Sequence, residues 1–164
     1  MKKPVFITGA TGYMGRRLAA ELIRRGYAVR ALVRPGSESR LAPGCEAVSG
    51  DALDPSGYER AVRGCETFVQ LVGVSHPSPA NMTQFQRVDG AAGSGAVAAA
   101  RRMGVAHFIY VSVAQPAPVM GTYVAALAAV EDDLRGAGFA ATILRPCSGV
   151  GRSGHSKGRK KCLR

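Results

Sequence analysis

A short apolar segment, a turn with three glycines and the start of a helix follow one another near the N-terminus. This stretch constrains the fold of the chain most. Val5-Phe6-Ile7 is a short apolar run with β-branched residues, which is typical of a strand buried on both faces. Gly9, Gly12 and Gly15 follow at a spacing of three, before an amphipathic pattern that runs to Gly26. Such a turn lets backbone N–H groups and the positive end of a helix approach a pyrophosphate. An ordinary βα turn would explain one or two of these glycines, so the stretch predicts nucleotide binding.

Up to residue 145 the chain alternates between strand-like and helix-like segments. We expect strands at 5–7, 28–33, 45–49, 67–72, 107–112 and 141–145, and helices at 15–25, 55–62, 81–103 and 122–136. This alternation predicts an α/β fold, a doubly wound parallel sheet with helices on both faces. Right-handed crossovers give the strand order 3-2-1-4-5-6, and ligands of such sheets bind at the carboxyl ends of the strands. Three glycines inside the third helix indicate close packing or a kink, at positions 90, 93 and 95.

The length of 164 residues and a hydrophobic content of 46% are enough for one domain with a core. The sequence has no run of 18 apolar residues and no signal-peptide pattern at its start, so we expect a cytoplasmic protein without a membrane partner. The four cysteines and three histidines are scattered without metal-ligand spacing, so no metal site is expected.

Positive charge is concentrated at the C-terminus. The net charge is +11, and residues 149–164 contain six basic residues and no acidic one. We therefore expect a domain over 1–151 and a basic, disordered tail over 152–164. One hypothesis for the tail is a truncated or frame-shifted C-terminus. The alternative is a basic arm for nucleic acid or an acidic membrane, although no aromatic residue interleaves the charges for base stacking.

The glycine spacing is G-x-x-G-x-x-G, with Thr11 where the commoner pattern has its middle glycine. The segment TGATGYMG resembles the fingerprint of extended and atypical short-chain dehydrogenase/reductase (SDR) proteins. The resemblance continues to about Gly151 and is closest to the NmrA-like, NAD(P)-binding branch; Leu144-Arg145-Pro146 also fits it. It implies a Rossmann domain whose cofactor turn consists of Gly9, Ala10, Thr11, Gly12, Tyr13, Met14 and Gly15.

Further cofactor contacts are expected where other strands end. Arg34 follows the second strand, at the position where NAD-specific proteins have an acidic residue. Its guanidinium can pair with a 2′-phosphate, which favours NADP as the cofactor. NAD remains the alternative cofactor. Alternatively, Arg34 is a solvated turn residue. The resemblance implies that Asp51 contacts the adenine amino group with Ala52 beside the ring, although Asp51 could instead cap a helix. It also implies a lining of the ribose and pyrophosphate by Leu71, Val72 and Gly73.

Catalysis in SDR enzymes resembles a Ser–Tyr–Lys arrangement, for which Ser112 and Tyr123 are the candidates here. The lysine position, four residues after the tyrosine, is Leu127. Without a neighbouring cation a phenol with a pKa of about 10 stays protonated at neutral pH and is a poor general base. Packing of Tyr123 at a helix start is therefore an equal alternative to catalysis.

Three functions follow from these features. The first is an NAD(P)-dependent oxidoreductase that transfers hydride to or from a small carbonyl or hydroxyl substrate. The second is a non-catalytic NAD(P) redox sensor or assembly subunit, which Leu127 favours. The third and weaker one is nucleic-acid binding through the tail.

Overall fold

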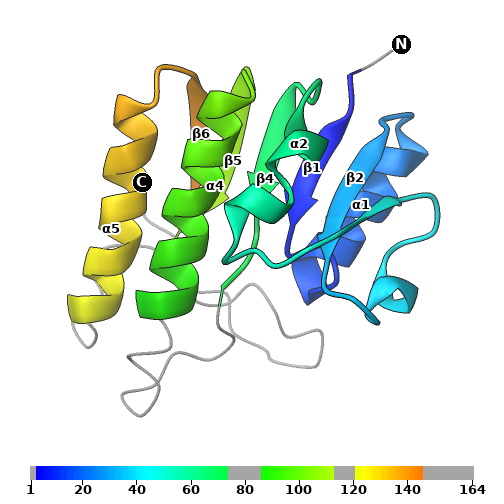
Figure 1. Cartoon of the computed structure of the whole chain (residues 1–164), viewed down its shortest axis with the longest axis horizontal. Coiled ribbons are helices and arrows are strands. Elements are labelled where there is room, and N and C mark those ends of the chain that lie inside the picture. The colour runs from blue at the N-terminus through cyan, green and yellow to red at the C-terminus, as the bar shows by residue number, and fades with distance from the viewer. Residues whose placement is uncertain (1–2, 74–85, 113–120, 146–164) are drawn as a thin grey trace, which may run out of the picture.

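The computed structural model describes residues 3–73, 86–112 and 121–145, and six parallel strands form one sheet through this part of the chain (Figure 1). Their order is β3-β2-β1-β4-β5-β6, and every neighbouring pair is parallel. This confirms the predicted doubly wound sheet and its strand order. The strands are β1 (Val5–Thr8), β2 (Val29–Val33), β3 (Glu46–Ser49), β4 (Thr67–Gln70), β5 (His107–Val111) and β6 (Ala140–Leu144).

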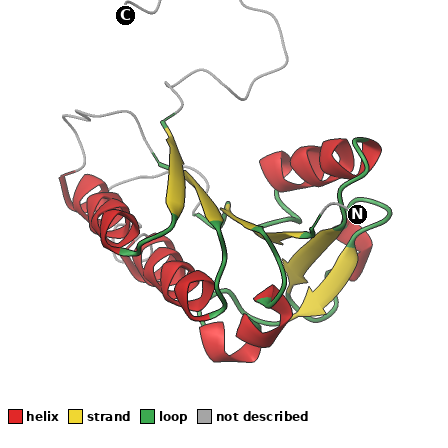
Figure 2. Ribbon diagram, turned by 90° about the horizontal axis from the view of Figure 1, so that it is seen from above, coloured by secondary structure: helices red, strands yellow, loops and turns green. Residues whose placement is uncertain are grey.

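Helices cover the two faces of the sheet unequally. Seen from above, α1 lies on one face, whereas α2, α4 and α5 lie on the other (Figure 2). Right-handed crossovers require this division, because the chain moves first to one side of β1 and then to the other. The α-helices are α1 (Tyr13–Arg24), α2 (Glu59–Val62), α4 (Ala91–Arg102) and α5 (Gly121–Gly136), with 3-10 turns at Glu38–Arg40 and Pro55–Gly57 and a π-turn at Gln86–Gly90.

Two hydrophobic cores follow from the alternation of side chains along the strands. On the α2–α4–α5 face, the phenylalanine rings of three neighbouring strands form a row. The ring centroids of Phe6 and Phe68 are 5.1 Å apart, and those of Phe68 and Phe108 are 5.0 Å apart. On the opposite face, residues such as Ile7 and Val69 pack toward α1. Both cores stabilise the strands whose carboxyl ends carry the candidate site residues.

The helix predicted over 55–62 is divided in two. A 3-10 turn ends at Gly57 and α2 begins at Glu59, with Tyr58 between them at φ −126°. This backbone lies outside the helical region, and the Tyr58 ring, which is 1% exposed, stacks on Phe6 at a centroid distance of 5.7 Å. Packing of one aromatic side chain therefore accompanies the break, and the local sequence gave no sign of it.

The glycines of α4 serve close packing. A Cβ atom at Gly93 would lie 2.6 Å from Cγ2 of Val130 on α5, and one at Gly95 would lie 2.7 Å from Cγ of Pro55. The first of the two alternatives, close packing rather than a kink, is thus confirmed at these two positions. Among the described helices, none combines the length and the apolar character needed to cross a bilayer.

Candidate functional site

The glycine turn joins the end of β1 to the start of α1 in a space that only glycine fits. Gly9 has a φ of +75°, and a Cβ atom there would lie 2.7 Å from both the carbonyl carbon and the oxygen of Leu71. A Cβ atom at Gly15 would lie 2.7 Å from Cα of Ala10. The N–H of Gly12 donates to the carbonyl of Gly9 at 3.0 Å, which closes the turn. These contacts bring α1 against the sheet edge as closely as backbone allows.

The N-terminus of α1 is free of side-chain caps. Gly12 is the N-cap residue with an extended backbone, no side chain caps the helix, and the first turn contains no acidic residue. The first N–H groups of a helix have no partner within the helix, and the helix dipole adds positive potential there. The start of α1 therefore has donors and positive potential for an anionic group such as a pyrophosphate.

Tyr13 and Met14 stand at this helix start with exposed fractions of 51% and 47%. The guanidinium of Arg17, one turn later, lies 3.7 Å above the centroid of the Tyr13 ring and donates to the Tyr13 carbonyl at 3.2 Å. Arg17 was not foreseen from the sequence. A helical i to i+4 spacing between an aromatic residue and an arginine was the signal that could have indicated this pair.

The end of β4 lies directly beside the glycine turn. The N–H of Leu71 donates to the carbonyl of Thr8 at 3.1 Å, so hydrogen bonding to β1 continues one residue past the end of β4. Leu71 and Val72 are half-buried and Gly73 is exposed. The structure thus brings Leu71 and Val72 next to Gly9, and Gly73 follows them in the chain.

Arg34 and Asp51 follow β2 and β3 at the same edge of the sheet, and both side chains are exposed. The carboxylate of Asp51 accepts a hydrogen bond from the N–H of Leu53 at 2.9 Å, whereas Ala52 between them is half-buried. Asp51 therefore stabilises a local turn, and its predicted contact with adenine stays a prediction. The contact of Arg34 with a 2′-phosphate likewise stays a prediction.

A buried polar pair lies beneath the glycine turn. Thr8 and Gln70 are each 1% exposed, and the Thr8 hydroxyl donates to Oε1 of Gln70. Within the described part of the chain the Gln70 amide nitrogen has no hydrogen-bond partner. The sequence interpretation missed this pair, although two polar residues at the ends of otherwise apolar adjacent strands were a visible signal.

The candidates for catalysis differ in what the structure describes. Ser112 follows β5, is 3% exposed, and its hydroxyl donates to Oε1 of Glu131 at 2.8 Å. Tyr123 belongs to α5, but its side chain lies outside the described residues. Leu127 is 3% exposed and packs in the core on the α4–α5 side. Position 127, where the SDR resemblance expects a lysine, thus contributes to packing.

Glu131 is a buried acid of α5 that the sequence interpretation did not single out. Its side chain is 3% exposed, and it pairs with Arg145, which follows β6, and with Arg135. Burial by itself raises the pKa of Glu131, but hydrogen bonds from Arg145 and Ser112 outweigh it, so the pKa lies below its usual value. Its sequence signal was an acid one turn after the apolar Leu127, on the sheet-facing side of the helix.

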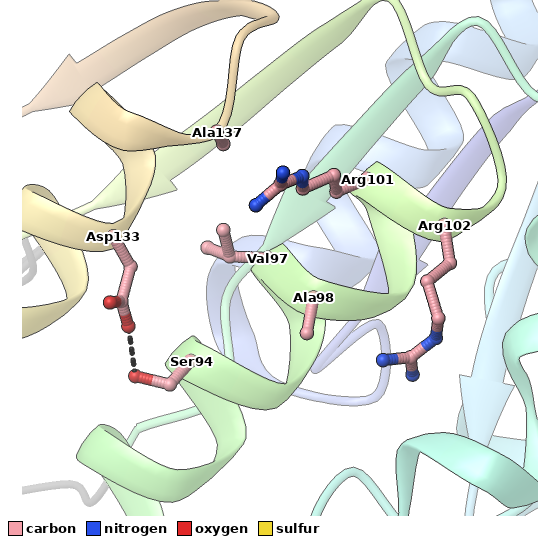
Figure 3. A pocket seen from close by; sticks show the side chains of 7 residues that line it. All are labelled: Ser94, Val97, Ala98, Arg101, Arg102, Asp133 and Ala137. Atoms are coloured by element: carbon pink, nitrogen blue, oxygen red, sulfur yellow. Dashed lines mark hydrogen bonds between the residues drawn. The ribbon is translucent and has the colours of Figure 1, made fainter.

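A cavity of about 500 Å³ lies elsewhere, between α4 and α5 (Figure 3). The Arg101 side chain extends toward this space, and in its lining the Ser94 hydroxyl donates a hydrogen bond of 2.5 Å to the carboxylate of Asp133. Because α4 ends at Arg102, shortly before β5 begins, this end of the cavity is at the amino edge of the sheet. It is therefore distinct from the glycine turn at the carboxyl edge. The cavity lining consists of Ser94, Val97, Ala98, Arg101, Arg102, Asp133 and Ala137.

A family model described as NAD(P)H-binding matches residues 9–150, which includes the glycine turn and all of the strands after β1. The chain belongs to this NAD(P)H-binding family. The prediction of an NAD(P)-binding Rossmann domain is thereby confirmed, and the glycine turn and the uncapped start of α1 are the features of this domain that suit a dinucleotide.

The chain is similar to known proteins, among them a reductase. The chain is 34% identical over 144 residues to the ceramide reductase of Caulobacter vibrioides, covering 87% of this chain and 45% of that protein. Its fold resembles WbmH of Bordetella bronchiseptica, solved with NAD+, with a TM-score of 0.72, 24% identity and coverage of 87% and 55%. It also resembles an NAD-bound SDR superfamily protein of Agrobacterium tumefaciens, with a TM-score of 0.68, 23% identity and coverage of 86% and 48%. The chain thus spans about half the length of these proteins.

Proposed function

We propose that this chain binds NADP(H) in preference to NAD(H) and serves an oxidoreductase of the SDR type. The observation that carries the cofactor site is the glycine turn, where Gly9 and Gly15 leave no space for a side chain and the start of α1 has no cap. The preference for NADP(H) rests on Arg34, an exposed cation at the end of β2. Oxidoreductase activity is supported by the similarity to the ceramide reductase.

In this proposal the carboxyl end of each of these strands binds a different part of the cofactor. The pyrophosphate binds at the N–H groups of the glycine turn, and Arg34 pairs with the 2′-phosphate. Asp51 and Ala52 lie toward the adenine, while Leu71, Val72 and Gly73 lie along the ribose. Gly73 is exposed, and a Cβ atom there would lie 2.8 Å from Oδ1 of the buried Asp89, so this position has room only for glycine.

The proposed chemistry is hydride transfer between the nicotinamide and a small substrate. The bound cofactor would supply the hydride to a carbonyl or accept it from a hydroxyl-bearing carbon. Tyr123, near the start of α5, is the proposed proton donor to the substrate oxygen. The position where the SDR resemblance expects a lysine is Leu127, which is buried in the core. Tyr123 is therefore proposed as a proton donor rather than as a general base, and Ser112 supports the site from the end of β5.

The cofactor part of the proposal is tested by fluorescence titration with NADPH and with NADH. We expect saturable binding of both, with the tighter dissociation constant for NADPH. Equal affinities would contradict the NADP preference, and no saturable binding of either would contradict the cofactor site itself.

The catalytic part is tested by NADPH oxidation with a panel of small aldehydes and ketones, comparing the native chain with Tyr123→Phe. We expect turnover that falls by about 10² or more in the variant, because general acid catalysis contributes at least that much. Saturable NADPH binding without turnover would instead support the redox sensor or assembly subunit.

Residues 152–164 lie outside the described residues, so the disordered tail and the domain boundary at 151 stay predictions. The cytoplasmic location also stays a prediction.

A further inference from the structure

The hydroxyl of Ser112 has its only proton committed to Glu131. The Ser112 backbone is fixed first, because its N–H donates to the carbonyl of Leu144 at 2.8 Å. Its hydroxyl lies 2.8 Å from Oε1 of Glu131. An ionised carboxylate only accepts hydrogen bonds, whereas a serine hydroxyl donates one and accepts two. The direction of this bond is therefore set by chemistry, and two acceptor positions remain on Ser112.

Glu131 is held in this orientation from three sides. Oε1 accepts from Ser112 and from Nε of Arg145 at 3.2 Å, while Oε2 accepts from Nη2 of Arg145 and from Nη2 of Arg135 at 3.2 Å. The carboxylate is 3% exposed, so water does not compete strongly for it. Two guanidinium partners keep the carboxylate ionised. This cluster joins α5 to the carboxyl ends of β5 and β6.

We propose that Glu131 is a positioning residue that makes Ser112 a hydrogen-bond acceptor, so that the ligand group at Ser112 is a donor hydroxyl. This inference rests on the proposed function, since it concerns the substrate of that same sheet edge. A serine that has donated its proton to Glu131 cannot polarise a carbonyl oxygen. It can accept a hydrogen bond from a secondary alcohol, so the site favours the alcohol form of a substrate over the ketone form.

The variant Glu131→Gln reverses this polarity while retaining the shape of the side chain. Two guanidinium groups donate at the Oε2 position and only one at the Oε1 position, so the amide oxygen should occupy the Oε2 position. The amide nitrogen then faces Ser112 and donates to its oxygen, which releases the serine proton for an acceptor such as a carbonyl. A purely structural role of Glu131 predicts no such reversal.

The position of the proton is tested directly by neutron diffraction from crystals of the full chain exchanged into D₂O. In the native chain we expect the Ser112 deuterium on the line from Oγ to Oε1 of Glu131. In Glu131→Gln we expect it turned away from residue 131. A native deuterium that points away from Glu131 would overturn the proposal, whatever the cofactor result.

The ligand preference is tested with cyclohexanol and cyclohexanone, a probe pair of similar shape, titrated by NMR into the chain saturated with NADP+. We expect a three- to tenfold preference for the alcohol, which corresponds to about one hydrogen bond. The preference should reverse in Glu131→Gln and vanish in Ser112→Ala. Asp132→Asn is the control, because the Asp132 side chain is 73% exposed and its carboxylate pairs with Arg135. The alcohol-to-ketone preference of this variant should equal that of the native chain.

An alcohol-to-ketone ratio that stays the same in the native chain, Glu131→Gln and Ser112→Ala would overturn the ligand assignment. Failure of NADP+ to bind would instead contradict the proposed function, and the neutron result would still decide the polarity of Ser112.

Discussion

At the scale of single residues, two glycines with the same backbone conformation have different reasons to be glycine. Gly9 and Gly26 have φ values of +75° and +79°. A Cβ atom at Gly9 would collide with the backbone of Leu71, whereas one at Gly26 would have no atom within 4 Å. Both positions require left-handed backbone, but only Gly9 also requires an absent side chain.

We predict that Gly26→Ala lowers the free energy of unfolding by about 1–2 kcal/mol, the cost of left-handed backbone in a residue with a Cβ atom. Gly9→Ala should cost about 2 kcal/mol more, because backbone atoms must also move. Urea denaturation measures both, and NADPH titration should show weakened binding only for Gly9→Ala. Equal losses of stability in the two variants would contradict the steric argument.

Arg34 is the residue on which the proposed preference for NADP(H) depends. We predict that Arg34→Asp lowers the ratio of NADPH to NADH affinity by about tenfold or more, since a hydrogen bond to a charged group contributes about 1.5–3 kcal/mol. Fluorescence titration with both cofactors measures the ratio. Arg101→Asp is the matched control, because Arg101 is exposed but lies on α4 at the cavity. An unchanged ratio in Arg34→Asp would exclude the 2′-phosphate contact.

At the scale of elements, the contact between α4 and α5 depends on glycine in a helix. Glycine inside a helix costs about 1 kcal/mol relative to alanine, so α4 gives up helical stability at Gly93. In return the methyl groups of Val130 approach the α4 backbone where a Cβ atom would stand. Gly90, by contrast, would place a Cβ atom 3.8 Å from Cβ of Ala126, an ordinary contact.

We predict opposite effects for alanine at these two positions of the same segment. Gly93→Ala should destabilise the protein by about 1–3 kcal/mol, because overpacking exceeds the gain in helix propensity. Gly90→Ala should stabilise it by up to about 1 kcal/mol. Thermal and urea unfolding measure both. If Gly93→Ala were as stable as Gly90→Ala, α4 and α5 could move apart without a loss of stability, which would contradict the prediction.

At the scale of the whole molecule, the hydroxyl of Tyr58 lies in the core on the α2–α4–α5 face, where burial of a polar group without a partner costs free energy of folding. The Tyr58 hydroxyl is buried and has no hydrogen-bond partner among the described residues. Burial is the main reason that the pKa of Tyr58 is raised to about 12; the charge of Arg102 opposes the shift, and the charges of Asp54 and Glu59 add to it. The folded state therefore favours the neutral phenol more strongly than the unfolded state does.

This difference predicts how stability depends on pH in alkali. Because the folded pKa is raised, the contribution of Tyr58 is complete below about pH 10, the unfolded value, and is lost as pH rises toward 12. Tyr58→Phe should remove a fall of about 3 kcal/mol across this range and should not reduce stability at neutral pH. Urea unfolding at several pH values measures this.

Tyr13→Phe is the control for the alkaline prediction, since its ring is 51% exposed. The alkaline fall should remain in that variant. An identical fall in the native chain and in Tyr58→Phe would contradict the assignment of this loss to Tyr58.

The sequence by itself determined the features that depend on neighbours along the chain. Apolar runs indicated all six strands, and the handedness of crossovers then gave their order without further information. The glycine turn was also visible, because three glycines at a spacing of three directly after an apolar run form a local pattern in the sequence. The NAD(P)-binding character of the domain followed from this local pattern and is shown by the family match.

Only the tertiary structure decided which distant side chains meet. Ser112 and Glu131 are 19 positions apart, and Arg145 comes from a third element, so no periodicity along the chain links them. The same holds for Gly93 and Val130, and for the burial of Leu127 in the core. Packing of helices on a sheet sets these contacts, because burial makes an unpaired charge or an overlapping atom costly wherever it stands in the sequence.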